Sequence, residues 1–70
     1  MYNIKQLYQI IIGIIEKIDI STYASPQYTA SQMEQIRIGE KHGVDTSIYQ
    51  KSSYSEYKMK AIRRFLERND

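Results

Sequence analysis

The segment YTASQMEQIRIGEKHGVDTSIY, residues 28–49, decides the fold because much of it occurs more than once in the chain. Tyr28 has counterparts 26 residues before and after it, at Tyr2 and Tyr54. Other sets recur at the same interval: Leu7, Met33 and Met59; Ile10, Ile36 and Ile62; Gly13 and Gly39; Arg37 and Arg63; Asp19 and Asp45; Ser21 and Ser47; Tyr23 and Tyr49. This recurrence predicts three tandem repeats, and a repeat stack usually presents a surface for binding.

Local signals predict one long helix in each unit. Thr29 followed by Gln32 fits a capping box, and so does Asn3 followed by Gln6. The apolar residues after Thr29 keep helical spacing, and Gly43 is suited to end the helix in a left-handed conformation.

A short second helical turn is expected between consecutive long helices. Asp45 and Ser47 are placed to cap such a turn, and Asp19 and Ser21 are placed to do the same one unit earlier. We therefore predict an all-α fold with three long helices and short helical turns between them, forming a small bundle or a solenoid-like stack. The expected single domain covers residues 1–70, with units at about 1–18, 19–44 and 45–70.

Two glycines fall inside the predicted helices. Gly13 and Gly39 should each cost about 1 kcal/mol relative to Ala. Their recurrence predicts that a neighbouring helix or an aromatic ring passes too closely for a side chain, with a ligand lying on the glycine surface as the alternative. The third unit carries Phe65 at this position, where we expect no further neighbour on one side.

The first helix is apolar almost all round, unlike the other two. Ile11, Ile14 and Ile15 stand where the second unit has charged residues. A helix of this kind must be buried on more than one side. Two explanations stay open: extra packing within the chain, or a surface for a dimer or another partner. The apolar run from Leu7 to Ile18 is shorter than the roughly 20 residues needed to cross a membrane, so no membrane association is predicted.

Composition argues against catalysis and cofactor binding. The chain has no Cys, so it forms neither a disulfide nor a thiolate metal site, and a reducing cytoplasm is expected. Its one His, His42, lies beside the predicted helix end at Gly43 and has no obvious catalytic partner. We predict a protein that is not an enzyme and that holds no cofactor and no metal.

The net charge of +2 falls entirely after Val44, and most of the basic residues there lie on the last helix. Such a cluster is typical of phosphate binding, and Tyr54 and Tyr57 would stack on bases. The competing interpretation is a solvated helix whose cations complement the helix dipole. The nucleic-acid hypothesis uses Lys58, Lys60, Arg63, Arg64 and Arg68.

The middle unit resembles a short helical repeat in proteins of Firmicutes phages and conjugative elements, often found in tandem within large polyvalent proteins. The resemblance covers essentially the whole chain. The residues that carry it are Tyr28, Thr29, Gln32, Met33, Glu34, Gln35, Ile36, Arg37, Ile38, Gly39, Gly43, Val44, Asp45, Ser47 and Tyr49. At the position of Glu40 the family usually has Leu, so Glu40 departs from the family pattern. The resemblance implies a mobile-element origin and a role in interaction rather than catalysis.

Our leading hypothesis is a non-enzymatic protein–protein interaction module of a phage or mobile element, acting in the cytoplasm of a bacterial host. Its partner would be a host or element-encoded protein, for example a CRISPR-type defence nuclease that it inhibits. The alternatives are nucleic-acid binding through the last helix and a homo-oligomeric scaffold, with a homodimer formed through the apolar first helix. The candidate partner-binding residues are Tyr8, Ile11, Ile15, Glu40, Tyr57, Lys60 and Arg64.

Overall fold

The computed structural model describes residues 1–68, and helices are its only regular secondary structure over that range. Each α-helix and each 3₁₀ helix begins 26 residues after its counterpart in the unit before it. In chain order the elements are α1 (Ile4–Ile15), the 3₁₀ helix η1 (Ile20–Thr22), α2 (Ala30–Lys41), η2 (Thr46–Ile48) and α3 (Glu56–Arg68). The predicted all-α fold of three long helices with short helical turns between them is confirmed.

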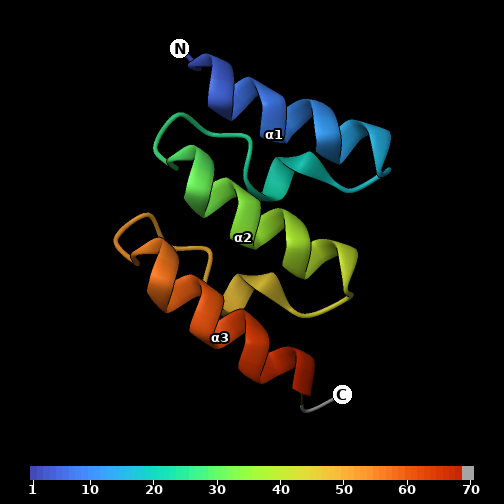
Figure 1. Ribbon diagram of the computed structural model, residues 1–70, viewed down its shortest axis with the longest axis vertical. Helices are drawn as coiled ribbons and strands as arrows, with labels where there is room; N and C mark the ends of the chain where they lie inside the picture. The colour runs from blue at the N-terminus through green and yellow to red at the C-terminus, as the bar shows by residue number, and fades with distance from the viewer. Residues whose placement is uncertain (69–70) are drawn as a thin grey trace.

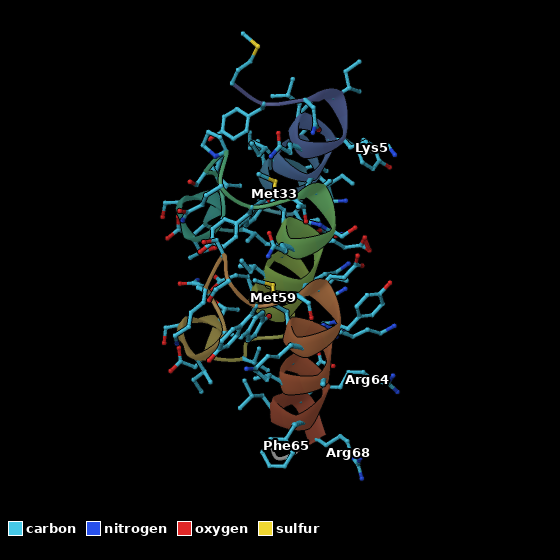
Figure 2. All side chains as sticks on the ribbon, turned by 90° about the vertical axis from the view of Figure 1, so that its left-hand side faces the viewer. Lys5, Met33, Met59, Arg64, Phe65 and Arg68 are labelled. Atoms are coloured by element: carbon cyan, nitrogen blue, oxygen red, sulfur yellow. The ribbon has the colours of Figure 1, made fainter. Side chains whose placement is uncertain are left out.

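The three long helices lie side by side and run in the same direction, with α2 between α1 and α3 (Figure 1). Each is followed by a return segment that contains a 3₁₀ helix, and Figure 2 shows these segments on one side of the helices. The molecule is therefore a two-layer stack, measuring 35 × 26 × 15 Å along its principal axes. Of the two predicted shapes, the solenoid-like stack describes it better, because α2 separates the outer helices.

The predicted caps fix where the helices begin. Asn3 and Thr29 each accept a hydrogen bond from the backbone N–H of the glutamine three residues later, and that glutamine accepts one from the N–H of the cap. In α3 the Ser55 hydroxyl accepts from the Lys58 N–H at 3.1 Å. The same two glutamines also hold the next unit: Gln6 Nε2 donates to the Tyr28 carbonyl and Gln32 Nε2 to the Tyr54 carbonyl, both at 2.6 Å.

The C-terminal ends of α1 and α2 use one geometry, although only the end of α2 carries a glycine. Gly43 has a φ of 77°, and the next N–H, of Val44, donates to the Gly39 carbonyl at 3.0 Å. This matches the expected left-handed helix end. Lys17 occupies the equivalent position after α1 and adopts a φ of 60°, a conformation that costs a non-glycine residue roughly 1 kcal/mol. The sequence analysis did not anticipate this strained lysine.

The core lies between the two layers. Met33, Ile36 and Met59 from the helices and Tyr23 and Tyr49 from the return segments are completely buried. Figure 2 shows the two methionines on the side of the helices that faces the return segments.

The recurring glycines allow a tyrosine to reach the helix backbone. The Tyr23 hydroxyl donates to the Gln9 carbonyl and the Tyr49 hydroxyl to the Gln35 carbonyl, each at 2.7 Å. A Cβ atom at Gly13 or at Gly39 would stand only 2.0 Å from the respective hydroxyl oxygen. Burial raises the pKa of both tyrosines, so each hydroxyl keeps its proton and remains a donor. The predicted aromatic ring is therefore the reason for these glycines, and it comes from the return segment that follows the helix.

Replacing Gly39 should break this contact. We expect Gly39→Ala to lower the free energy of unfolding by about 1–3 kcal/mol, because the added methyl group displaces the Tyr49 hydroxyl from its carbonyl. Urea unfolding of Gly39→Ala, Tyr49→Phe and the double variant measures the coupling between the two sites. The double variant should lose less stability than the sum of the two single variants. Strict additivity would show that the hydroxyl is not what excludes the side chain.

Candidate functional site

Six large apolar side chains are exposed along α1, with accessibilities from 42% at Leu7 to 84% at Ile4. Successive members are one or three residues apart, so they form a single stripe along the helix. We call this stripe the α1 outer face; it consists of Ile4, Leu7, Tyr8, Ile11, Ile14 and Ile15. No other element among residues 1–68 exposes as many large apolar side chains.

Repeat equivalence identifies what kind of surface this is. Leu7 corresponds to Met33 and Met59, which are completely buried, whereas Leu7 is 42% exposed. Ile11 and Ile15 correspond to Arg37 and Lys41, which attach α2 to α1. The α1 outer face is therefore equivalent to the face through which α2 packs on α1 and to the face through which α3 packs on α2. Within the described chain no helix covers it.

The equivalent faces of α2 and α3 form the two contacts between long helices. We call the α1–α2 contact the first junction and the α2–α3 contact the second junction. Arg37 Nε donates to Gln9 Oε1, and Arg63 Nε donates to Gln35 Oε1, both at 2.9 Å. At the first junction Glu16 also pairs with Arg37 at 2.7 Å and with Lys41 at 2.9 Å. Each junction therefore joins polar groups, whereas the α1 outer face replaces those groups with isoleucine.

In the second junction the acidic residue lies on the later helix, α3, whereas in the first junction it follows the earlier helix, α1. His42 Nδ1 lies within hydrogen-bonding distance of Glu67 Oε2, which also accepts from Arg63 Nη1 at 2.7 Å. Burial raises the pKa of Glu67, but the hydrogen bonds from His42 and Arg63 outweigh this and lower it overall. The sequence analysis found no partner for His42, because Glu67 lies 25 residues further along the chain.

The first junction should make the fold sensitive to acid. The hydrogen bond from Lys41, followed by that from Arg37, lowers the pKa of Glu16 from its ordinary value of 4.5. Because the folded-state pKa is the lower one, the stabilisation is complete above pH 4.5 and is lost as the pH falls through the folded-state value. We therefore expect the melting temperature of the native protein to fall below pH 4.5 more steeply than that of Glu16→Gln.

Thermal melts of both proteins between neutral and acidic pH make this comparison. Glu34→Gln is a matched control, since Glu34 forms no ion pair with any described residue. If Glu16→Gln and the native protein lost stability in parallel, the Glu16 pairs would not contribute to the pH dependence.

The predicted partner-binding residues separate into three places. Tyr8, Ile11 and Ile15 lie together on the α1 outer face, with exposures of 61%, 52% and 72%. Glu40 is half-buried and accepts a hydrogen bond at 2.7 Å from the hydroxyl of Thr46, in the return segment that follows α2, so its carboxylate already has a partner within the chain. The remaining three are exposed on α3, with α2 between them and α1: Tyr57, Lys60 and Arg64.

Half of the α1 outer face was absent from the predicted partner-binding residues: Ile4, Leu7 and Ile14. Ile14 was noted as part of the apolar first helix, but all three have apolar counterparts in at least one later unit. Their signal was their position in the first unit, which has no preceding repeat within this sequence to cover them.

The basic residues of the last helix are only partly free to meet a phosphate. Arg63 is 8% exposed and bonded to Gln35 and Glu67, and Lys58 Nζ lies 4.0 Å from the centroid of the Tyr54 ring. This contact also covers a face of the ring that was expected to stack on bases. Three of the five predicted cations remain exposed without these contacts: Lys60, Arg64 and Arg68. Figure 2 shows the two arginines pointing away from the return segments.

The rim of the α1 outer face carries both signs of charge. An open hollow between the first halves of α1 and α2 is lined in part by Ile4 and Tyr8, and by Lys5 and Glu34. An apolar centre with a polar edge is the usual composition of a protein–protein contact surface.

No group of three or more His, Asp or Glu side chains among residues 1–68 is placed to hold a metal ion. None of the described helices combines the length and the apolarity needed to cross a membrane. Comparisons with protein-family models, with curated proteins and with solved structures find no match. The resemblance to a Firmicutes mobile-element repeat therefore stays a prediction.

Proposed function

We propose that the protein is a non-enzymatic interaction module that binds another protein through the α1 outer face. The observation that carries this proposal is the exposure of six apolar side chains on a face whose counterparts in α2 and α3 pack against a helix. Of the two explanations open from the sequence, extra packing within the chain is not supported, because Ile11, Ile14 and Ile15 remain 52%, 59% and 72% exposed.

A contiguous stripe differs from scattered surface residues. Single exposed apolar side chains are ordinary, but a continuous apolar patch on a small protein usually marks a contact with another molecule. The α1 outer face is more apolar than the equivalent face of α2, where Arg37 and Lys41 stand in place of Ile11 and Ile15. This favours a face that is covered when the protein functions.

Nucleic-acid binding is the weaker candidate. Its support is the exposure of Lys60, Arg64 and Arg68 on α3, which a solvated basic helix also explains. A cytoplasmic role as inhibitor of a host factor such as a defence nuclease rests on the resemblance alone, and it remains a prediction.

Affinity capture from a Firmicutes lysate tests the proposal. Tagged native protein and two variants, Ile11→Asp and Ile48→Asp, are incubated with lysate, with and without nuclease. Ile48 is an exposed isoleucine on η2, 47% accessible, and serves as the matched control. We expect a discrete protein that survives nuclease treatment with the native protein and with Ile48→Asp and is lost with Ile11→Asp.

Two outcomes would contradict the proposal. Retention of every captured protein by Ile11→Asp would show that the α1 outer face is not the binding surface. Capture that disappears with nuclease and with Arg64→Glu, but not with Ile11→Asp, would assign binding of nucleic acid to α3.

A further inference from the structure

We infer that the α1 outer face is covered by the same face of a second copy of this chain, with the two α1 helices antiparallel about a twofold axis. This inference rests on the proposed function, because it concerns the same face and names a second copy as its occupant. A different protein captured from a lysate through this face would have to displace that copy. Three features of the molecule support it: the composition of that face, the chemistry of the opposite end of the stack and the charges at the ends of α1.

The α1 outer face is complementary to the same face of a second copy. None of its six side chains is charged, so two copies meet without burying a charge. Ile4, Leu7, Ile11 and Ile14 occupy alternating intervals of three and four residues, which is the pattern of a helix-pairing seam, and Tyr8 and Ile15 flank it. The surface continues the packing direction already used inside the chain, where α2 packs on α1 and α3 packs on α2 (Figure 1).

The opposite end of the stack is a poor occupant for this face. The exposed side of α3 is equivalent to the side on which α1 and α2 receive the next helix, and Figure 2 shows Phe65 at that end. Lys58, Ala61, Phe65 and Arg68 stand there in place of Gln32, Gln35, Gly39 and His42. By repeat equivalence, seating α3 of one copy on α1 of another would place Arg68 opposite Ile15, where the equivalent contact inside the chain joins His42 to the Glu67 carboxylate. Lys58 would stand in place of the Gln32 amide that holds the next unit. Head-to-tail stacking is therefore disfavoured, and a closed symmetric dimer remains.

The charges at the helix ends select the antiparallel orientation. α1 has no acidic residue in its first turn and no basic residue in its last turn, and Lys5 lies near its start. Antiparallel pairing brings Lys5 of each copy close to the C-terminal end of the other α1, where the helix dipole favours a cation. Parallel pairing would instead place the two Lys5 side chains side by side.

The dimer should be weak and dependent on concentration. A helix of 12 residues is about 18 Å long, so one helix face buries less than a standard interface does. Sedimentation velocity between about 10 μM and 1 mM covers the range in which such an interface associates. We expect the mass of the native protein to rise from 8.3 kDa toward twice that value over this range.

Two variants identify the face that is responsible. Ile11→Asp should remain at 8.3 kDa throughout, while Ile48→Asp should associate as the native protein does. Because Ile11 is 52% exposed, its variant should keep the native helix content, which circular dichroism of the dilute protein checks. Native protein that stays monomeric at about 1 mM, or Ile11→Asp that still dimerises, would overturn the inference.

Cysteine pairing tests the orientation, since the native chain has no Cys. Ile4→Cys and Ile15→Cys, one of them carrying a tag that separates their masses, are mixed and oxidised at high concentration. The antiparallel arrangement predicts a disulfide mainly between the two different variants. Disulfides mainly between identical variants would show parallel helices and contradict the arrangement.

The two proposals fail in different ways. If the native protein is monomeric but Ile11→Asp still loses a captured protein, the face binds a different partner, and only the second-copy inference is overturned. If the native protein is monomeric and Ile11→Asp also retains every captured protein, both proposals fail.

Discussion

The position of every helix in this stack depends on a tyrosine hydroxyl seated over a helical glycine. Tyr23 and Tyr49 reach carbonyl groups of α1 and α2 at a point where Gly13 and Gly39 offer no side chain. Each contact fixes the distance between a helix and the return segment that follows it. The next helix can then start at a defined height, because the capping glutamine of the earlier helix donates to the backbone just ahead of it.

Much of the fold could be predicted because it depends on local chemistry that repeats. Capping pairs, the glycine at a helix end and the aspartate that starts each 3₁₀ helix are decided within a few residues. Lys17 was missed because a lysine gives no local sign of a left-handed conformation; only its alignment with Gly43 does. The contact between His42 and Glu67 was missed for a different reason, since it joins two units and depends on how one helix lies over the next.

The candidate site was only half visible in the sequence. An apolar helix shows that its side chains avoid water, but it does not show which neighbour covers them. Leu7 and Met33 are repeat equivalents in the sequence, yet the structure exposes Leu7 and buries Met33, because α2 has a helix before it and α1 has none among residues 1–68. Glu40 was selected for its departure from an apolar pattern, yet its carboxylate accepts a hydrogen bond from Thr46, in the return segment that directly follows α2. The pattern of polar and apolar residues thus identified α1 as the helix with an exposed apolar face, but it did not identify correctly which single residues are available to a partner.

The two helix junctions are not interchangeable. In the first the carboxylate belongs to the earlier unit, at Glu16, whereas in the second it belongs to the later unit, at Glu67. If α3 packed directly on α1 and skipped α2, Arg63 would take the place of Arg37, but Glu67 would take the place of Lys41, so Glu16 would face a carboxylate where it now has a cation. Similar units in one chain can otherwise pair out of order while the protein folds. The exchange of acidic and basic partners between the two junctions therefore favours packing of the units in their native order, and it does so without a covalent link.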